Sequence, residues 1–225
     1  ALRDAGLTRI TLSLDSLDPQ TFRELSGNRG EVAIVLDAIR AAETAGYRSL
    51  KINCVVMRGV NDDHALDLVD YFRGTPHVLR FIEYMDVGTC NDWRNELVVA
   101  SAELRARINT RWPMQPLQAN YGGEVAQRYT FVDGGGEIGF ISSVSEPFCG
   151  DCTRARLSAD GRLYTCLFAQ AGHDLRAILR SGADDVEVAQ LVSSVWRARD
   201  DRYSELRSEL ASSPRERVEM YEIGG

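Results

Sequence analysis

The sequence lacks the features that mark several common classes of protein. It has no run of about 18 or more apolar residues, which excludes a membrane-spanning helix. Its first residues, 1–6, lack a secretory signal pattern and an initiator Met, so we expect upstream sequence to be missing. The net charge of −7 provides no basic footprint for coating DNA or RNA. We expect a soluble cytoplasmic protein without a membrane or nucleic-acid partner.

Cysteine is also scarce, and its count is odd. A chain of 225 residues with five cysteines does not favour a disulfide framework. We expect Cys54 and Cys90 to be ordinary buried residues. The other three, Cys149, Cys152 and Cys166, lie close together in the sequence, which indicates a metal site in a reducing compartment.

The first ninety or so residues repeat a strand-then-helix rhythm. Alternating apolar side chains predict a strand over 9–15, and two more are predicted over 49–56 and 79–85. Between them, one helix begins at Asp18-Pro19, a second ends at Gly46, and a third begins near Asp62. This alternation predicts parallel βαβ units.

The predicted strands carry polar residues on one face, which calls for an explanation, because parallel sheets usually bury apolar side chains on both faces. In a barrel, inward residues near the carboxyl ends of the strands face the active site. We therefore expect Ser13, Lys51, Glu83 and Met85 to face one cavity. A solvated strand face is the alternative.

The rhythm changes after about residue 90. A short helix is predicted over 101–108, with Ser101 as its N-cap. Residues 127–144 predict two strands around Asp133-Gly134-Gly135-Gly136. Since no helix follows these glycines, we interpret them as a hairpin turn and not as a phosphate loop. Helices are predicted to close the chain.

The most informative stretch carries three cysteines in the spacing Cys-x2-Cys-x13-Cys. A Cys-x2-Cys pair lets two thiolates bind one centre from a tight turn. Asp160-Gly161 is a type I′ turn signal, so the chain is expected to reverse there. A two-residue turn would set Cys166 beside Ala155, near Cys152. Hairpin geometry would thus deliver the third thiolate to the first two.

The spacing leaves the identity of the metal open. Structural zinc takes four protein ligands, and Cys90, His173 or Asp151 could supply a fourth. An iron–sulfur cluster held by three cysteines would instead keep one iron free to bind another group. Buried cysteines without a metal are a third, weaker interpretation.

Arg154 and Arg156 lie between the second and third cysteines, spaced to share one face of a strand. Two guanidinium groups there match a phosphate or a guanine edge. They could also neutralise the thiolates, or simply form a solvated face.

This hairpin, with Phe-Cys-x2-Cys-x-Arg-x-Arg-Leu-Ser-x-Asp-Gly followed by Cys-Leu-Phe, resembles the GTP 3′,8-cyclase family of molybdenum cofactor biosynthesis. Further matches run along nearly the whole chain; they are Ser13-Leu14-Asp15, Gly59-Val60-Asn61-Asp62, residues 80–88, residues 123–126, residues 199–204 and Gly224-Gly225.

The resemblance implies an α/β fold, an incomplete TIM-like radical S-adenosylmethionine barrel over 1–90. An α+β domain over 91–225 would follow, with an auxiliary 4Fe–4S cluster and a Gly-Gly tail. The implied reaction is a radical cyclisation of GTP to 3′,8-cyclo-7,8-dihydro-GTP, the first step towards cyclic pyranopterin monophosphate. The synthase of that product is the implied pathway partner, and a homodimer is compatible with the family.

The resemblance also implies the roles of individual residues. Cys149, Cys152 and Cys166 would bind the auxiliary cluster, whose free iron meets the guanine. GTP would be contacted by Lys51, Arg154, Ala155 and Arg156. Ser13 and Met85 would border S-adenosylmethionine. The Gly224-Gly225 tail would reach into the active site, unless it is a frayed end.

One departure from the family pattern matters. No Cys-x3-Cys-x2-Cys motif, which holds the radical-generating 4Fe–4S cluster of the family, occurs in these 225 residues. We therefore expect an N-terminally truncated barrel and a chain that is inactive by itself. Two alternatives are another radical S-adenosylmethionine enzyme with an auxiliary cluster and a non-catalytic zinc-binding module.

Overall fold

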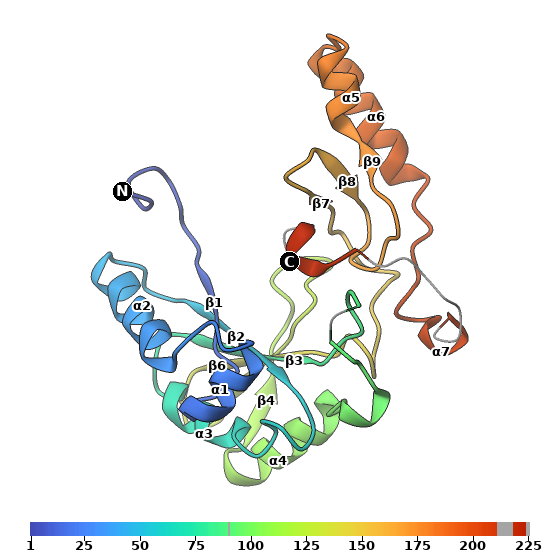
Figure 1. Cartoon of the computed structure of the whole chain (residues 1–225). Helices are drawn as coiled ribbons and strands as arrows, with labels where there is room; N and C mark the ends of the chain where they lie inside the picture. The colour runs from blue at the N-terminus through green and yellow to red at the C-terminus, as the bar shows by residue number, and fades with distance from the viewer. Residues whose placement is uncertain (90, 211–217, 224–225) are drawn as a thin grey trace. The chain divides into compact units, whose positions relative to one another are not determined.

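A computed structural model describes residues 1–89, 91–210 and 218–223 of the chain (Figure 1). The chain divides into two compact units. Ala1–Met85 and Arg94–Glu146 form the first unit, and Asp86–Trp93 and Pro147–Gly225 form the second. These units do not follow a single boundary near residue 90, because the segment after Trp93 packs with the first unit. The division into domains over 1–90 and 91–225 stays a prediction.

The first unit is a mixed α/β structure built on a six-stranded sheet of order β1-β2-β3-β6-β5-β4. Its strands are β1 (Thr11–Ser13), β2 (Lys51–Val56), β3 (Val78–Glu83), β4 (Met114–Pro116), β5 (Gln127–Phe131) and β6 (Glu137–Ile141). The pairs β1-β2, β2-β3 and β3-β6 are parallel. The pairs β6-β5 and β5-β4 are antiparallel. The predicted parallel units and the hairpin around Gly134-Gly135 are confirmed.

Helices connect these strands. They are α1 (Pro19–Leu25), α2 (Val32–Thr44), α3 (Ala65–Phe72) and α4 (Ser101–Arg111), with a 3₁₀ turn at Asn95–Leu97. Asp18 caps α1 by accepting a hydrogen bond from the Thr21 N–H, as predicted. Gly46 follows α2 with φ of 88°, the left-handed conformation expected after a helix end. The helix expected near Asp62 begins later, because the Asp62 carboxylate accepts from the Gly59 N–H and forms a turn.

The parallel strands present two different faces. Ile52 and Cys54 of β2 lie beside Leu79 and Phe81 of β3, and all four are buried with apolar residues of α1 to α4 in one core. The opposite face carries side chains that are only half-buried. This second face, which we call the open face, includes Lys51, Asn53 and Arg80.

Glu83 corrects one prediction. It pairs with Val56 in the register of β2 and β3, so it lies on the helix-covered face and not beside Lys51. Its buried carboxylate accepts hydrogen bonds from the N–H groups of Ser101, Val144 and Ser145 and from the Ser145 hydroxyl. The expected cap by the Ser101 side chain is therefore wrong, because a carboxylate from β3 caps α4 instead.

The second unit is smaller and contains an antiparallel sheet of order β7-β8-β9. Its elements are β7 (Arg156–Leu157), β8 (Arg162–Tyr164), β9 (His173–Asp174), α5 (Leu175–Arg180), α6 (Asp185–Arg197), α7 (Arg207–Leu210) and a 3₁₀ turn at Met220–Glu222. Leu163, Leu175 and Val195 form a small core between the sheet and the two longer helices. The helices predicted near the end of the chain are confirmed.

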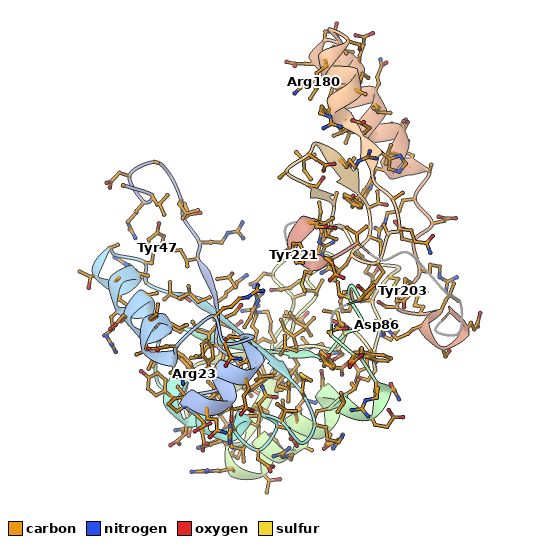
Figure 2. The ribbon with its side chains drawn as sticks, in the orientation of Figure 1. Arg23, Tyr47, Asp86, Arg180, Tyr203 and Tyr221 are labelled. Carbon is orange, nitrogen blue, oxygen red and sulfur yellow. The ribbon has the colours of Figure 1, made fainter. Side chains whose placement is uncertain are left out.

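Within the second unit, Asp86 joins the segment 86–93 to the residues near the end of the chain. Its buried carboxylate accepts hydrogen bonds from the Tyr203 hydroxyl and from Arg207 Nε, the latter at 2.9 Å (Figure 2). Phe168 stacks on Tyr203 with ring centroids 4.4 Å apart, and the Arg207 guanidinium lies over both rings. A buried ion pair inside an aromatic cluster therefore fixes this segment.

The helices of residues 1–89, 91–210 and 218–223 include none with the length and apolar character needed to cross a membrane.

We predict that Glu83→Gln lowers the free energy of unfolding by about 2 to 3 kcal/mol, because an amide group would face buried N–H donors that need an acceptor. Urea denaturation followed by circular dichroism measures this change. The control is Glu103→Gln, which breaks an exposed pair with Arg58 and is expected to cost less than about 1 kcal/mol. Equal losses in the two variants would contradict a special role for Glu83.

Candidate functional site

The cysteine hairpin reverses through a three-residue turn and not through the expected two-residue type I′ turn. Arg156 pairs with Tyr164 and Leu157 with Leu163, and the Ser158 N–H donates to the Arg162 carbonyl. A type I′ turn needs positive φ at both central residues, but of Asp160 and Gly161 only Gly161 has it, at 84°.

Ser158 explains this turn. Its hydroxyl oxygen accepts from the Arg162 N–H at 3.0 Å, and its hydroxyl donates to the Asp160 carboxylate. These bonds close the longer loop. The observed register differs by one residue from the two-residue register on which the expected place of Cys166 beside Ala155 depends. The predicted two-residue register is therefore wrong by one residue.

The three cysteines of the hairpin are half-buried and free of disulfides. The Cys152 N–H donates to the Cys149 carbonyl at 3.3 Å, which closes the tight turn that the Cys-x2-Cys spacing predicts. Arg154 Nε donates to the Cys152 sulfur at 3.4 Å. Burial opposes ionisation of Cys152, but hydrogen bonds from Arg154 and the charges of Arg154 and Arg199 outweigh it and lower its pKa.

Cys166 has the opposite balance. Burial raises the pKa of its thiol, and the nearby Asp201 carboxylate and Cys149 add to the increase. The Phe168 N–H, which donates to the Cys166 sulfur at 3.4 Å, and the positive charge of Arg199 oppose it. The thiols of Cys149 and Cys166 are thus close enough to influence each other electrostatically.

Among the described residues, no three His, Cys, Asp or Glu side chains form a group that could hold a metal ion. The three thiols share one hairpin, but they do not converge on a point as the ligands of one tetrahedral ion would. Thiolates that bind separate irons of one cluster stand farther apart than thiolates that bind a single ion.

Arg154 and Arg156 are both half-buried, whereas Ala155 and Leu157 are exposed, so the two arginines share a face of the hairpin. The Arg154 guanidinium also lies over the Phe148 ring at 5.2 Å. Burial and the neighbouring charge of Arg154 lower the pKa of Arg156, and the cysteines oppose that effect. Two concentrated positive charges therefore lie beside the thiols.

Two further candidate residues, Ser13 and Lys51, lie on the open face of the first unit, and Met85 follows β3. Lys51, the only lysine in the sequence, begins β2, and Ser13 ends β1 beside Asn53. Ser13 is exposed, and Lys51 and Met85 are half-buried. Burial and the charges of Arg80 and Arg9 lower the pKa of Lys51.

Arg80 is a candidate that sequence reasoning missed. It pairs with Asn53 in the sheet register, and its Nε donates to the Asn53 side-chain oxygen at 2.9 Å. Its side chain lies over Gly139 of β6, where a Cβ atom would approach Arg80 Cγ to 3.2 Å. The signal was present in the period of two along β3, which sets Arg80 on the opposite face from Phe81.

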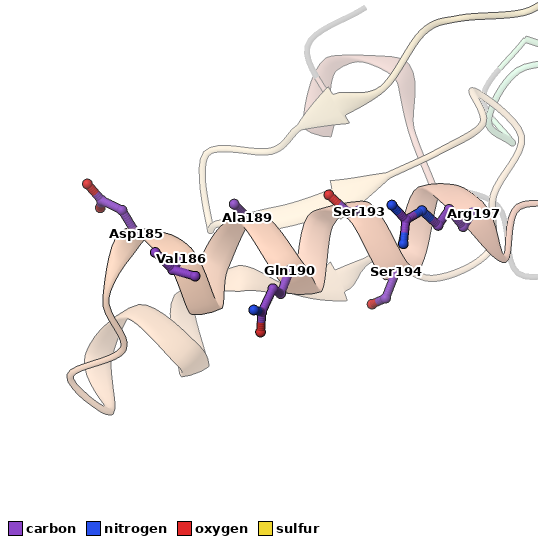
Figure 3. A pocket seen from close by; sticks show the side chains of 7 residues that line it. All are labelled: Asp185, Val186, Ala189, Gln190, Ser193, Ser194 and Arg197. Carbon is purple, nitrogen blue, oxygen red and sulfur yellow. The ribbon is translucent and has the colours of Figure 1, made fainter.

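Two of the hollows that the described residues form lie in the second unit. One, with a volume of about 540 Å³, is bordered by Cys166 and Phe168 and by Arg199, Arg202 and Tyr203. It adjoins the cysteine hairpin and contains charged and aromatic groups. The other, of about 500 Å³, runs along a single helix, α6, and contains no cysteine (Figure 3).

Cys90 and the Gly224-Gly225 tail lie outside the described residues. The segment just before the tail is anchored, because the Glu219 carboxylate accepts from the N–H and the hydroxyl of Thr89 at 2.7 and 2.8 Å. Ile223 is fully buried. Cys54 is buried in the core of the first unit, as predicted.

Comparison with known proteins finds a match to two family models. Residues 1–72 match the Radical SAM superfamily, and residues 77–205 match Molybdenum Cofactor Synthesis C. The second match contains the three hairpin cysteines and both neighbouring arginines.

Individual relatives agree with these matches. A protein named GTP 3′,8-cyclase from Xanthomonas campestris pv. campestris strain 8004 is 61% identical over the whole chain, which spans 66% of that relative's length. A protein of the same name from Acidothermus cellulolyticus is 50% identical over 92% of the chain and 58% of that relative's length. Another, from Staphylococcus haemolyticus, is 40% identical over 100% of the chain and 66% of that relative's length. Residues 1–72 match the Radical SAM superfamily, and the chain belongs to the Molybdenum Cofactor Synthesis C family.

Proposed function

We propose that this chain is the substrate-binding part of a GTP 3′,8-cyclase that acts in molybdenum cofactor biosynthesis. The observation that carries the proposal is the hairpin, in which three half-buried thiols adjoin two half-buried arginines within the region that matches the family. The relatives that bear this activity in their names are longer than the chain, which spans 66% of the first of them.

Cys149, Cys152 and Cys166 would hold an auxiliary 4Fe–4S cluster. Their chemistry fits, because thiolates are the ligands of such clusters and Arg154 already stabilises the thiolate form of Cys152. When bound, a cluster with three cysteine ligands offers one iron as a Lewis acid for an external ligand. Asp86, Tyr203 and Arg207 would hold the surrounding unit rigid.

GTP would be bound by positive side chains, since it brings about four negative charges to an acidic protein. Arg154 and Arg156, with Ala155 between them, would contact it at the hairpin. Lys51 would contact it from the open face of the first unit. Arg80, which lies on that face within electrostatic reach of Lys51, is a further candidate for a phosphate group.

The remaining assignments rest on family resemblance. Ser13 and Met85 would border S-adenosylmethionine at the carboxyl ends of β1 and β3, the end at which α/β sheets bind ligands. Gly224-Gly225 would enter the active site. The first unit would be part of an incomplete barrel, and the radical-generating cluster would be bound by a cysteine motif that these 225 residues do not contain. The cyclic pyranopterin monophosphate synthase would take the product onwards.

We predict that the chain, reconstituted with iron and sulfide without oxygen, binds about four irons and four sulfides. Inductively coupled plasma mass spectrometry and a sulfide assay measure both, and Cys166→Ser should lose most of them because a cluster with two cysteine ligands is poorly held. Cys54→Ser is the control, since that thiol is buried in the other unit. One zinc per chain without sulfide would support the zinc-binding module instead.

Arg156→Ala is predicted to weaken GTP binding by well over ~1 kcal/mol, because charged hydrogen bonds to the nucleotide are lost. Isothermal titration of the cluster-loaded chain without oxygen measures the dissociation constant. Arg180→Ala, on the exposed surface of α5, provides the matched loss of charge and should leave binding unchanged. An unaltered dissociation constant in Arg156→Ala would remove this residue from the proposed site.

GTP binding should also depend on pH through Lys51. The lowered pKa means that Lys51 loses its positive charge at a lower pH than an ordinary lysine, so affinity should fall on the alkaline side before the usual lysine range. Lys51→Arg keeps its charge throughout and should move this loss of affinity to higher pH. Dissociation constants measured across the alkaline range test the shift. An alkaline limb that is the same in both proteins would contradict a contact with Lys51.

A further inference from the structure

Arg199 is a charged residue that neither the family matches nor the sequence motifs assign to a role. It follows α6, and its guanidinium donates one hydrogen bond to the Cys152 carbonyl oxygen. A second donor, Nε, binds the Asp201 carboxylate at 3.1 Å. The group also lies over the Trp196 ring, 4.9 Å from its centroid. Three contacts thus hold one guanidinium in a fixed position beside the hairpin.

Arg199 completes a positive environment for Cys152. Arg154 contacts the sulfur of this cysteine and Arg199 contacts its carbonyl. The side chain of Arg199 is 11% exposed, so solvent screens its charge only weakly. Arg199 also lines the hollow that Cys166 borders, so its charge lies near both cysteines.

Asp201 supplies the opposing charge. Its carboxylate binds Arg199 and lines the same hollow as Cys166. The thiols are therefore exposed to a pair of opposite charges from one short segment, residues 199–201. Removal of the Arg199 charge should lower the electrostatic potential at the sulfurs, and removal of the Asp201 charge should raise it.

We propose that Arg199 is a positioning residue for the iron–sulfur cluster. Arg199 fixes the Cys152 turn and, together with Asp201, sets the reduction potential of the cluster. The inference rests on the proposed cluster and extends it. Reduction adds negative charge to a cluster, so a nearby guanidinium favours the reduced form and a nearby carboxylate disfavours it. Neither residue needs to touch the substrate to act in this way.

The test is a potentiometric titration of the reconstituted chain without oxygen or nucleotide, followed by electron paramagnetic resonance. Arg199→Gln should lower the ratio of reduced to oxidised cluster about tenfold at a fixed potential. For a one-electron couple, this equals a shift of the reduction potential by about 59 mV towards negative values. Asp201→Asn should shift the potential in the positive direction. Arg199→Lys should retain a potential close to that of the wild type, because the charge remains.

Arg197→Gln is the matched control, since Arg197 ends α6 two residues earlier and is exposed. Its potential should equal that of the wild type. Iron content and circular dichroism establish that each variant is folded and loaded. If Arg199→Gln fails to fold, the direction of the shift in Asp201→Asn decides the question.

Unchanged potentials in loaded Arg199→Gln and Asp201→Asn, or shifts of the same sign in both, would overturn the proposal and leave the proposed function standing. A wild-type chain that binds no cluster would instead overturn the proposed function, and this inference with it. The two failures are therefore distinguishable by the iron content of the wild-type chain.

Discussion

The turn at residues 159–161 is the constraint on which the candidate site depends. Gly161 takes a left-handed conformation there, and the Ser158 hydroxyl closes the loop. Because side chains alternate between the faces of a strand, a change of one residue in this turn would exchange the faces of everything that follows. The three-residue loop pairs Arg156 with Tyr164 and Leu157 with Leu163. Local backbone geometry thus decides which charges surround the thiols.

Electrostatics in this acidic protein are local. A net charge of −7 repels anions at long range, yet Arg154, Arg156 and Arg199 concentrate positive charge around one hairpin. On the open face of the first unit, Lys51 and Arg80 form a second positive region. Burial makes each of these charges more effective, because less solvent screens it.

The secondary structure was largely predictable from periodicity and helix caps. The alternation in 9–15 and 49–56, the Asp18 cap and the end of a helix at Gly46 depend on neighbours in sequence, and the structure confirms them. The cysteine hairpin was predictable for the same reason. Its register was not, because the hydrogen bonds of the Ser158 side chain favour a longer turn than Asp160-Gly161 alone indicates.

Long-range contacts account for the other errors. Its polarity makes Glu83 a candidate for the cavity, but its carboxylate accepts hydrogen bonds from N–H groups about twenty and sixty residues later in the chain. Glu83 is therefore a buried structural acceptor. Ser101 carries a typical cap side chain, yet the carboxylate of Glu83 takes that position. The alternation along β3 sets Arg80 on the open face, but nothing beside it in sequence shows that Gly139 leaves space for its side chain.

The single lysine of the chain has a practical consequence. Lys51 begins the second strand of the parallel sheet, between β1 and β3, and its backbone N–H is bonded to the Ile10 carbonyl. A protease specific for lysine would find one cleavage site in the 225 residues, and it could cut only after this part of the sheet opens. The rate at which two fragments appear would therefore measure the opening of the first unit alone.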